Sequence, residues 1–158
     1  MSRKTKLSIR RCGLVLFVLY MILLVYFLFF AEEYGRVAQA ERLYRYNLVP
    51  FVEIKRFWMY RAQLGTFAVF SNIFGNVIGF LPFGFILPII FRRMNSCFLI
   101  CISGFLFSLT VEVIQLVTKV GCFDVDDMIL NTLGAVLGYV CFVICDHIRR
   151  KYHYGKKI

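Results

Sequence analysis

Four long segments with almost no charge constrain the fold of this chain more than any other feature. They cover about residues 12–31, 64–91, 95–118 and 127–146, and between their ends the only charged side chain is Glu112. A helix needs about 20 mostly apolar residues to cross the ~30 Å hydrocarbon core of a bilayer. We therefore predict an all-α polytopic membrane protein with four transmembrane helices in a single domain, residues 1–158.

The distribution of Lys and Arg predicts the orientation. Twelve of the 19 basic residues lie before the first span, between the second and third spans, or after the fourth. Four crossings would place these three segments on one side, and the positive-inside rule makes that side the cytoplasm. Topology also accounts for the net charge of +10, so membrane lipids are the expected partners and nucleic acid is not.

The connection between the first two spans contains a second kind of pattern. In "NLVPFVEIKRFWMYRA", Phe51, Ile54, Phe57 and Trp58 recur at helical spacing, with charged residues around the rest of the helix. This predicts an amphipathic helix lying on the external membrane surface. The alternative is a linker whose aromatic residues anchor the ends of the neighbouring helices.

The second span is unusual in length and composition. Pro82 and Pro88 fall within "FLPFGFILP", and each removes a backbone donor. We expect a kinked or tilted helix that is broken in its cytoplasmic half. Small residues four positions apart allow close approach of a neighbouring helix. Two such pairs occur in the second and fourth spans: Gly75 with Gly79, and Gly134 with Gly138.

Polar residues of three spans fall at one depth, in the external half of the bilayer. Glu112 and Gln115 share a helix face, and the others lie near the external ends of the second and fourth spans. We expect one polar, ligand-binding pocket formed by seven residues: Asn72, Asn76, Glu112, Gln115, Asp124, Asp127 and Asn131.

Glu112 carries most of the functional interpretation. A carboxylate at this depth costs roughly 2.5–3.5 kcal/mol on insertion scales. Hydrogen bonding between helices contributes about 0.6 kcal/mol on average, which explains the asparagines. A glutamine would make the same bonds without a charge, so we favour a functional site over a structural contact.

Three carboxylates, Asp124, Asp126 and Asp127, precede the fourth span. One of them is expected to cap that helix, and all three gain from its positive end. No cofactor and no metal are expected. Asp124 and Asp127 would be the ligands if a divalent cation were bound.

Four motifs in order resemble the VanZ-like family of bacterial membrane proteins. They are "YNLVPF", "NIFGNVIGFLPFG", "EVIQL" and "FDVDDMILNTLGAVLGY", and they run from about Tyr46 to Tyr139. The resemblance implies a plasma-membrane protein of a Gram-positive bacterium and a link to resistance against the glycopeptide teicoplanin. The family's recurrent polar residues match the seven pocket residues above. The basic residue that some relatives carry shortly before "FDVDD" is absent, and Lys119 is the nearest cation.

Three functions remain open from the sequence. The first is binding of a cell-envelope lipid, a lipid-linked cell-wall component or a glycopeptide in the external pocket. The second is a membrane-embedded enzyme acting on a lipid headgroup, with Glu112 as the candidate catalytic base and Asp124 and Asp127 as acid partners or metal ligands. The third is a small transporter. The sequence gives no indication of the oligomeric state.

Overall fold

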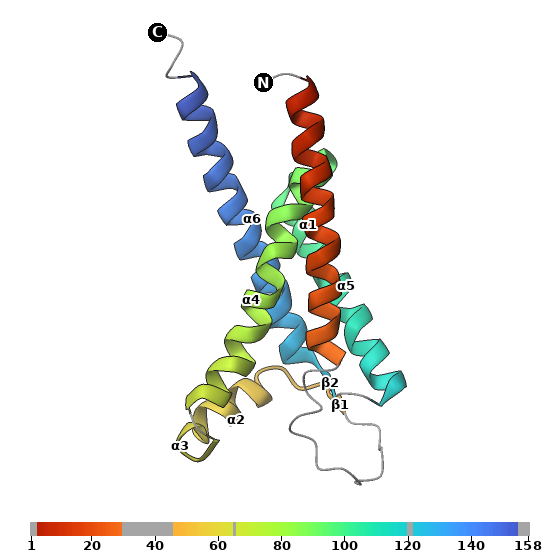
Figure 1. Cartoon of the computed structure of the whole chain (residues 1–158). Coiled ribbons are helices and arrows are strands. Elements are labelled where there is room, and N and C mark those ends of the chain that lie inside the picture. Colours follow the sequence, from red (N-terminus) through yellow and green to blue (C-terminus); the bar gives the residue numbers. More distant parts are fainter. Residues whose placement is uncertain (1–2, 30–45, 65, 120–121, 155–158) are drawn as a thin grey trace.

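The computed structural model describes residues 3–29, 46–64, 66–119 and 122–154. It confirms the all-α architecture, with four helices long and apolar enough to cross a membrane (Figure 1). The first begins and the last ends at the same end of the molecule, which we call the terminal end (Figure 1). The four helices are α1 (Arg3–Phe29), α4 (Thr66–Ile90), α5 (Cys97–Thr118) and α6 (Val125–Tyr154).

The last helix is longer than the predicted span. α6 contains 30 residues, which corresponds to about 45 Å at ~1.5 Å per residue. The apolar sequence ends near residue 146, but Asp146 forms ion pairs with Arg149 and with Arg150 one turn later. These pairs on an exposed polar segment continue the helix beyond the apolar region.

Helices α4 and α6 form the centre of the bundle, with α1 packed on α4 and α5 packed on α6 (Figure 1). Glycines make the central contact close. A Cβ added at Gly134 or Gly138 would overlap the backbone carbonyl of Val77 or Leu81 on α4. The predicted close approach at these two glycines is therefore confirmed.

The other predicted glycine pair behaves differently. A Cβ on Gly75 would meet nothing within 4 Å, and one on Gly79 would lie 3.6 Å from the Leu24 side chain of α1. The predicted close approach at Gly75 is wrong. Gly84 has that role instead, because a Cβ there would overlap the carbonyl of Ala135 on α6.

The predicted break in the second span is also wrong. α4 runs through Pro82 and Pro88 and ends at Ile90. Each proline removes only one backbone donor, and the neighbouring helix supports the chain between them. Gly138 of α6 lies directly against the α4 backbone at Leu81 and Phe85.

An apolar core occupies the middle of the bundle. The rings of Phe83 and Phe107 stack with centroids 5.3 Å apart, and Phe80 packs against both. Ile100 and Ala135, each 0% exposed, close the core between α5 and α6. This region separates the terminal end from the polar end described next.

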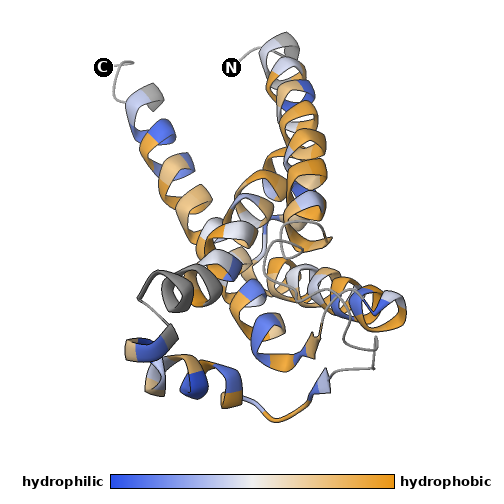
Figure 2. Cartoon of the chain, turned by 60° about the horizontal axis from the view of Figure 1, so that its bottom comes forward, coloured by the Kyte–Doolittle hydropathy of each residue, from blue (hydrophilic) through white to orange (hydrophobic). Residues whose placement is uncertain are grey.

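The polar end, opposite the terminal end, contains the two short strands and two short helices. Strand β1 (Tyr46–Asn47) pairs in parallel with β2 (Phe123–Asp124). The predicted amphipathic helix is observed as α2 (Val52–Met59), followed by α3 (Arg61–Leu64) (Figure 2). At the terminal end, a 3-10 turn, η2 (Arg92–Met94), joins α4 to α5 (Figure 1).

The glycine contacts predict a large difference between two Gly→Ala substitutions. Gly138→Ala should lower the free energy of unfolding by about 1–3 kcal/mol, because its new methyl group overlaps backbone that cannot move aside easily. Gly75→Ala, the matched control, should be neutral or slightly stabilising, since its Cβ faces open space. Melting temperatures of the purified proteins in detergent measure both. Equal losses would contradict the close α4–α6 contact.

Candidate functional site

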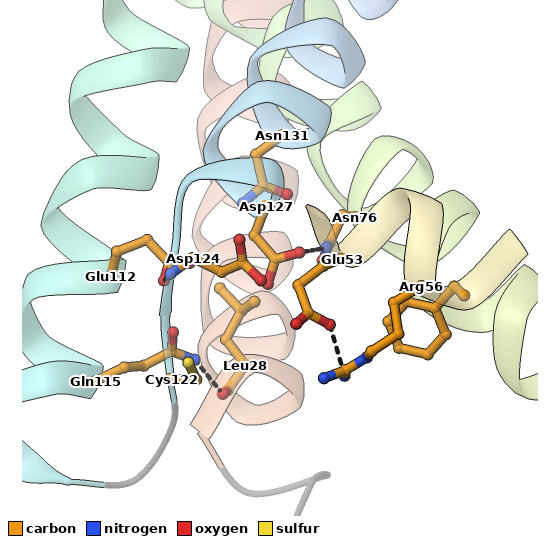
Figure 3. Close-up of a pocket in the computed structure, with 11 residues that line it drawn as sticks. Leu28, Glu53, Arg56, Asn76, Glu112, Gln115, Cys122, Asp124, Asp127 and Asn131 are labelled. Carbon is orange, nitrogen blue, oxygen red and sulfur yellow. Dashed lines mark hydrogen bonds and ion pairs between the residues drawn. The ribbon is translucent and has the colours of Figure 1, made fainter. Parts of the chain in front are cut away.

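A cavity of about 250 Å³ opens at the polar end of the bundle (Figure 3). Four carboxyl groups, three amides, one guanidinium and one thiol surround it, together with two apolar side chains. They come from five helices and from the segment before α6. The lining residues are Leu28, Glu53, Arg56, Phe57, Asn76, Glu112, Gln115, Cys122, Asp124, Asp127 and Asn131.

Six of the seven residues predicted to form a pocket line this one cavity. They are Asn76, Glu112, Gln115, Asp124, Asp127 and Asn131. The side chain of the seventh, Asn72, lies outside the described residues. Their role in binding a ligand stays a prediction.

The three aspartates before and within the first turn of α6 have different partners. Asp124 Oδ1 accepts from the backbone N–H of Asp126 at 2.9 Å, so Asp124 is the expected cap of this helix. The same oxygen accepts from Asn47 Nδ2 at 3.2 Å, which fixes β1. Asp127 accepts from Asn76 Nδ2 at 2.5 Å and so joins α6 to α4.

Asp126 holds α2 in place. Its carboxylate is 1% exposed and accepts from three backbone N–H groups, those of Phe51, Glu53 at 2.9 Å and Ile54 at 3.1 Å. Asp126 therefore satisfies the start of a helix more than 70 residues earlier in the chain. Phe51 itself has φ 67°, an unfavourable conformation for a bulky residue.

Glu112 is 2% exposed and belongs to the same network. Its Oε2 accepts from the backbone N–H of Asp124 at 2.9 Å, which connects α5 to β2. One turn along α5, Gln115 Nε2 donates to the backbone carbonyl of Leu28 at 3.0 Å. The buried face of α5 thus holds both the end of α1 and the strand before α6.

Asn131 forms a deep polar part of the cavity wall. It is 1% exposed, and its Nδ2 donates to Ser108 Oγ on α5 at 2.8 Å. Its Oδ1 is buried and has no hydrogen-bond partner among the described residues. Figure 3 shows the amide extending from α6 toward the other lining side chains. Most buried acceptors in folded proteins are paired, so this oxygen requires an explanation.

The sequence interpretation missed the contribution of α2. Glu53, Arg56 and Phe57 line the cavity, and the Arg56 guanidinium lies 2.5 Å from the Glu53 carboxylate. The amphipathic pattern indicated a helix but not which face turns toward the bundle. The signal that was available is Asp126, a carboxylate beyond the one needed to cap α6.

Two carboxyl groups of the cavity that lie outside the spans, those of Glu53 and Asp124, have raised pKa values. Burial raises the pKa of Asp124, and the hydrogen bond from the Asp126 backbone opposes this shift. Burial also raises the pKa of Glu53, against the attraction of Arg56. Desolvation is the largest cause of both shifts.

The cavity wall offers carboxylate and amide oxygens that can accept hydrogen bonds. In the described ranges, no three side chains among His, Cys, Asp and Glu are placed to hold a metal ion together. Cys122 brings a thiol to the cavity, which sequence reasoning did not include among the site residues.

Comparisons with known proteins agree with the motifs. A model of the VanZ/LLP1 family matches residues 17–146. Protein VanZ of Enterococcus faecium is 30% identical over 142 residues, which cover 86% of this chain and 77% of that protein. No solved structure shows a significant match.

The three bonds to Asp126 predict a local effect of removing its charge. In Asp126→Asn, one amide oxygen replaces two carboxylate oxygens, so we expect faster hydrogen exchange at the amides of Phe51, Glu53 and Ile54. The cost should be about 0.5–2 kcal/mol, as for loss of a helix cap.

Asp146→Asn provides the matched control, because its ion pairs lie on an exposed part of α6. It should leave exchange in α2 unchanged. Unaltered protection of the three α2 amides in Asp126→Asn would show that Asp126 does not hold this helix.

Proposed function

Because this chain belongs to the VanZ/LLP1 family of multi-pass membrane proteins, we propose that it binds the headgroup of a cell-envelope lipid or lipid-linked component in the cavity at the polar end. Through this binding it lowers susceptibility to glycopeptides such as teicoplanin. The observation that carries the proposal is the buried carboxylate Glu112 in a cavity open at the end of the spans.

The position of the cavity supports a lipid headgroup. It lies at the polar end, which the predicted topology places in the external leaflet of the plasma membrane. Residues of α1, α4, α5, α6 and the amphipathic helix α2 line it together (Figure 3). Amphipathic helices of this kind lie at the boundary of headgroups and acyl chains.

The size of the cavity supports the same assignment. Sites for drug-sized ligands usually measure about 300–1,000 Å³. The present volume of about 250 Å³ suits a headgroup rather than a whole glycopeptide. The effect on an antibiotic would then be indirect, through a lipid or lipid-linked component.

Catalysis is the second candidate, supported by Glu112. A buried carboxylate beside a bound headgroup could act as a general base. Transport is not proposed, because the apolar core around Phe83, Phe107 and Ala135 lies between the cavity and the terminal end.

Glu112→Gln tests the proposed function. Glutamine keeps the shape and can still accept from the Asp124 N–H, so the protein should express normally and remain monodisperse in detergent. Teicoplanin tolerance of cells producing the protein should fall to that of cells without it. Glu112→Asp keeps the charge but displaces it by about 1 Å, and it should reduce tolerance.

Asp146→Asn is the control for a lost carboxylate outside the cavity and should retain tolerance. A well-folded Glu112→Gln protein with full tolerance would mean that the Glu112 charge has no function.

The predicted orientation has its own test, which uses the native cysteines. Cys122 lies at the cavity and Cys97 at the terminal end of α5, and both are exposed. A variant that retains only Cys122 should react with a membrane-impermeant thiol reagent on intact cells. A variant that retains only Cys97 should react only after lysis. The opposite labelling pattern would place the cavity on the cytoplasmic side.

A further inference from the structure

The chemistry of the cavity wall selects among headgroups, an inference that rests on the proposed function. Glu53, Glu112, Asp124 and Asp127 contribute four carboxyl groups, and Arg56 is the one cation among the described lining residues. An anionic group would be repelled from the interior. A cationic group would be attracted by the excess of carboxyl groups over cations, and a neutral group would not.

Each amide of the cavity wall donates one hydrogen bond within the protein. Asn76 donates to Asp127, Gln115 donates to the Leu28 carbonyl, and Asn131 donates to Ser108. One N–H of each amide is thus bonded within the protein. The buried Oδ1 of Asn131 is an acceptor that no described residue pairs. A ligand that completes this site must bring N–H or O–H donors to it.

The position of Arg56 predicts how a ligand would be oriented in the cavity. Its side chain is 56% exposed, and it reaches the cavity from α2 beside Glu53 (Figure 3). A guanidinium in such a position can bind a phosphate with two parallel hydrogen bonds. The rim of the cavity therefore suits an anion, while its interior suits a cation.

We propose that the cavity binds a zwitterionic lipid headgroup that carries a primary ammonium and a phosphate. The ammonium enters among Glu112, Asp127 and Asn131, where its three donors meet carboxylate and amide oxygens. The phosphate stays at Arg56. A quaternary ammonium has no N–H donors and is normally held by several aromatic rings, whereas Phe57 is the one ring lining the described cavity.

Cys122 provides a direct report of occupancy. A variant that retains only this cysteine is placed in phosphatidylcholine nanodiscs, and its rate of modification by a neutral maleimide is measured. Replacing part of the lipid with phosphatidylethanolamine should slow the reaction several-fold, because the bound headgroup covers the thiol. Phosphatidylglycerol, which has hydroxyl donors but no cation, should have no such effect.

Two controls separate binding from a general change in the bilayer. A variant that retains only Cys97, at the terminal end, should react at the same rate in all three lipid mixtures. Adding Asp127→Asn to the Cys122 variant keeps the side-chain shape and removes one carboxylate. Protection by phosphatidylethanolamine should then weaken roughly tenfold, as for loss of one charged hydrogen bond.

The outcomes distinguish this inference from the proposed function. Protection by phosphatidylglycerol alone, protection by neither lipid, or protection that Asp127→Asn leaves intact would each overturn the ammonium assignment. The teicoplanin result for Glu112→Gln is independent of these measurements. If Glu112→Gln abolishes tolerance but phosphatidylethanolamine does not protect Cys122, the proposed function stands with another headgroup. If phosphatidylethanolamine protects Cys122 but Glu112→Gln keeps full tolerance, the headgroup binds and the proposed function is wrong.

Discussion

The arrangement of the polar end depends on hydrogen bonds to the carboxylates at the start of α6. Asp124 caps α6 and binds Asn47, Asp126 binds the first amides of α2, and Asp127 binds Asn76 of α4. Glu112 completes the set by accepting from the Asp124 backbone. Short polar residues on one turn therefore connect β1, α2, α4, α5 and α6. This explains why motifs as far apart as "YNLVPF" and "FDVDD" occur together, since each supplies partners of the other.

The close contact of α4 with α6 gives this network a fixed base. Gly134 and Gly138 bring the two backbones together, and Gly84 does so from the other side. Because the rigid pair sets the positions of Asn76, Asp127 and Asn131, the cavity wall does not rely on loops alone. Helix α2 and the segment before α6 complete the cavity wall. Phe51, just before α2, keeps its unfavourable positive φ because its backbone N–H donates to Asp126.

Sequence patterns predicted the helices well and their contacts less well. Apolar length and depth were enough for the four spans and for bringing Asn76, Glu112 and Asn131 to one cavity. Small-xxx-small spacing alone could not indicate that Gly84, rather than Gly75, faces α6, because the pattern contains no information about the neighbour. The contact between Asp126 and α2 spans more than 70 residues, so the sequence could show a carboxylate beyond the one needed for the cap but not the helix that it binds.

The polar groups of the cavity are not all explained by folding. Asp126 has three backbone donors, and Asp124 has a cap and an amide, so their burial is compensated within the protein. Asn131 Oδ1 has no such compensation among the described residues, although leaving a buried acceptor unpaired costs about 1–3 kcal/mol. A bundle shaped only by stability would place an apolar side chain there, as in the core at Ile100 and Ala135. Asn131 lines the same cavity as Glu112, and the ligand proposed above would pair the Oδ1 of Asn131 for which the described residues supply no donor.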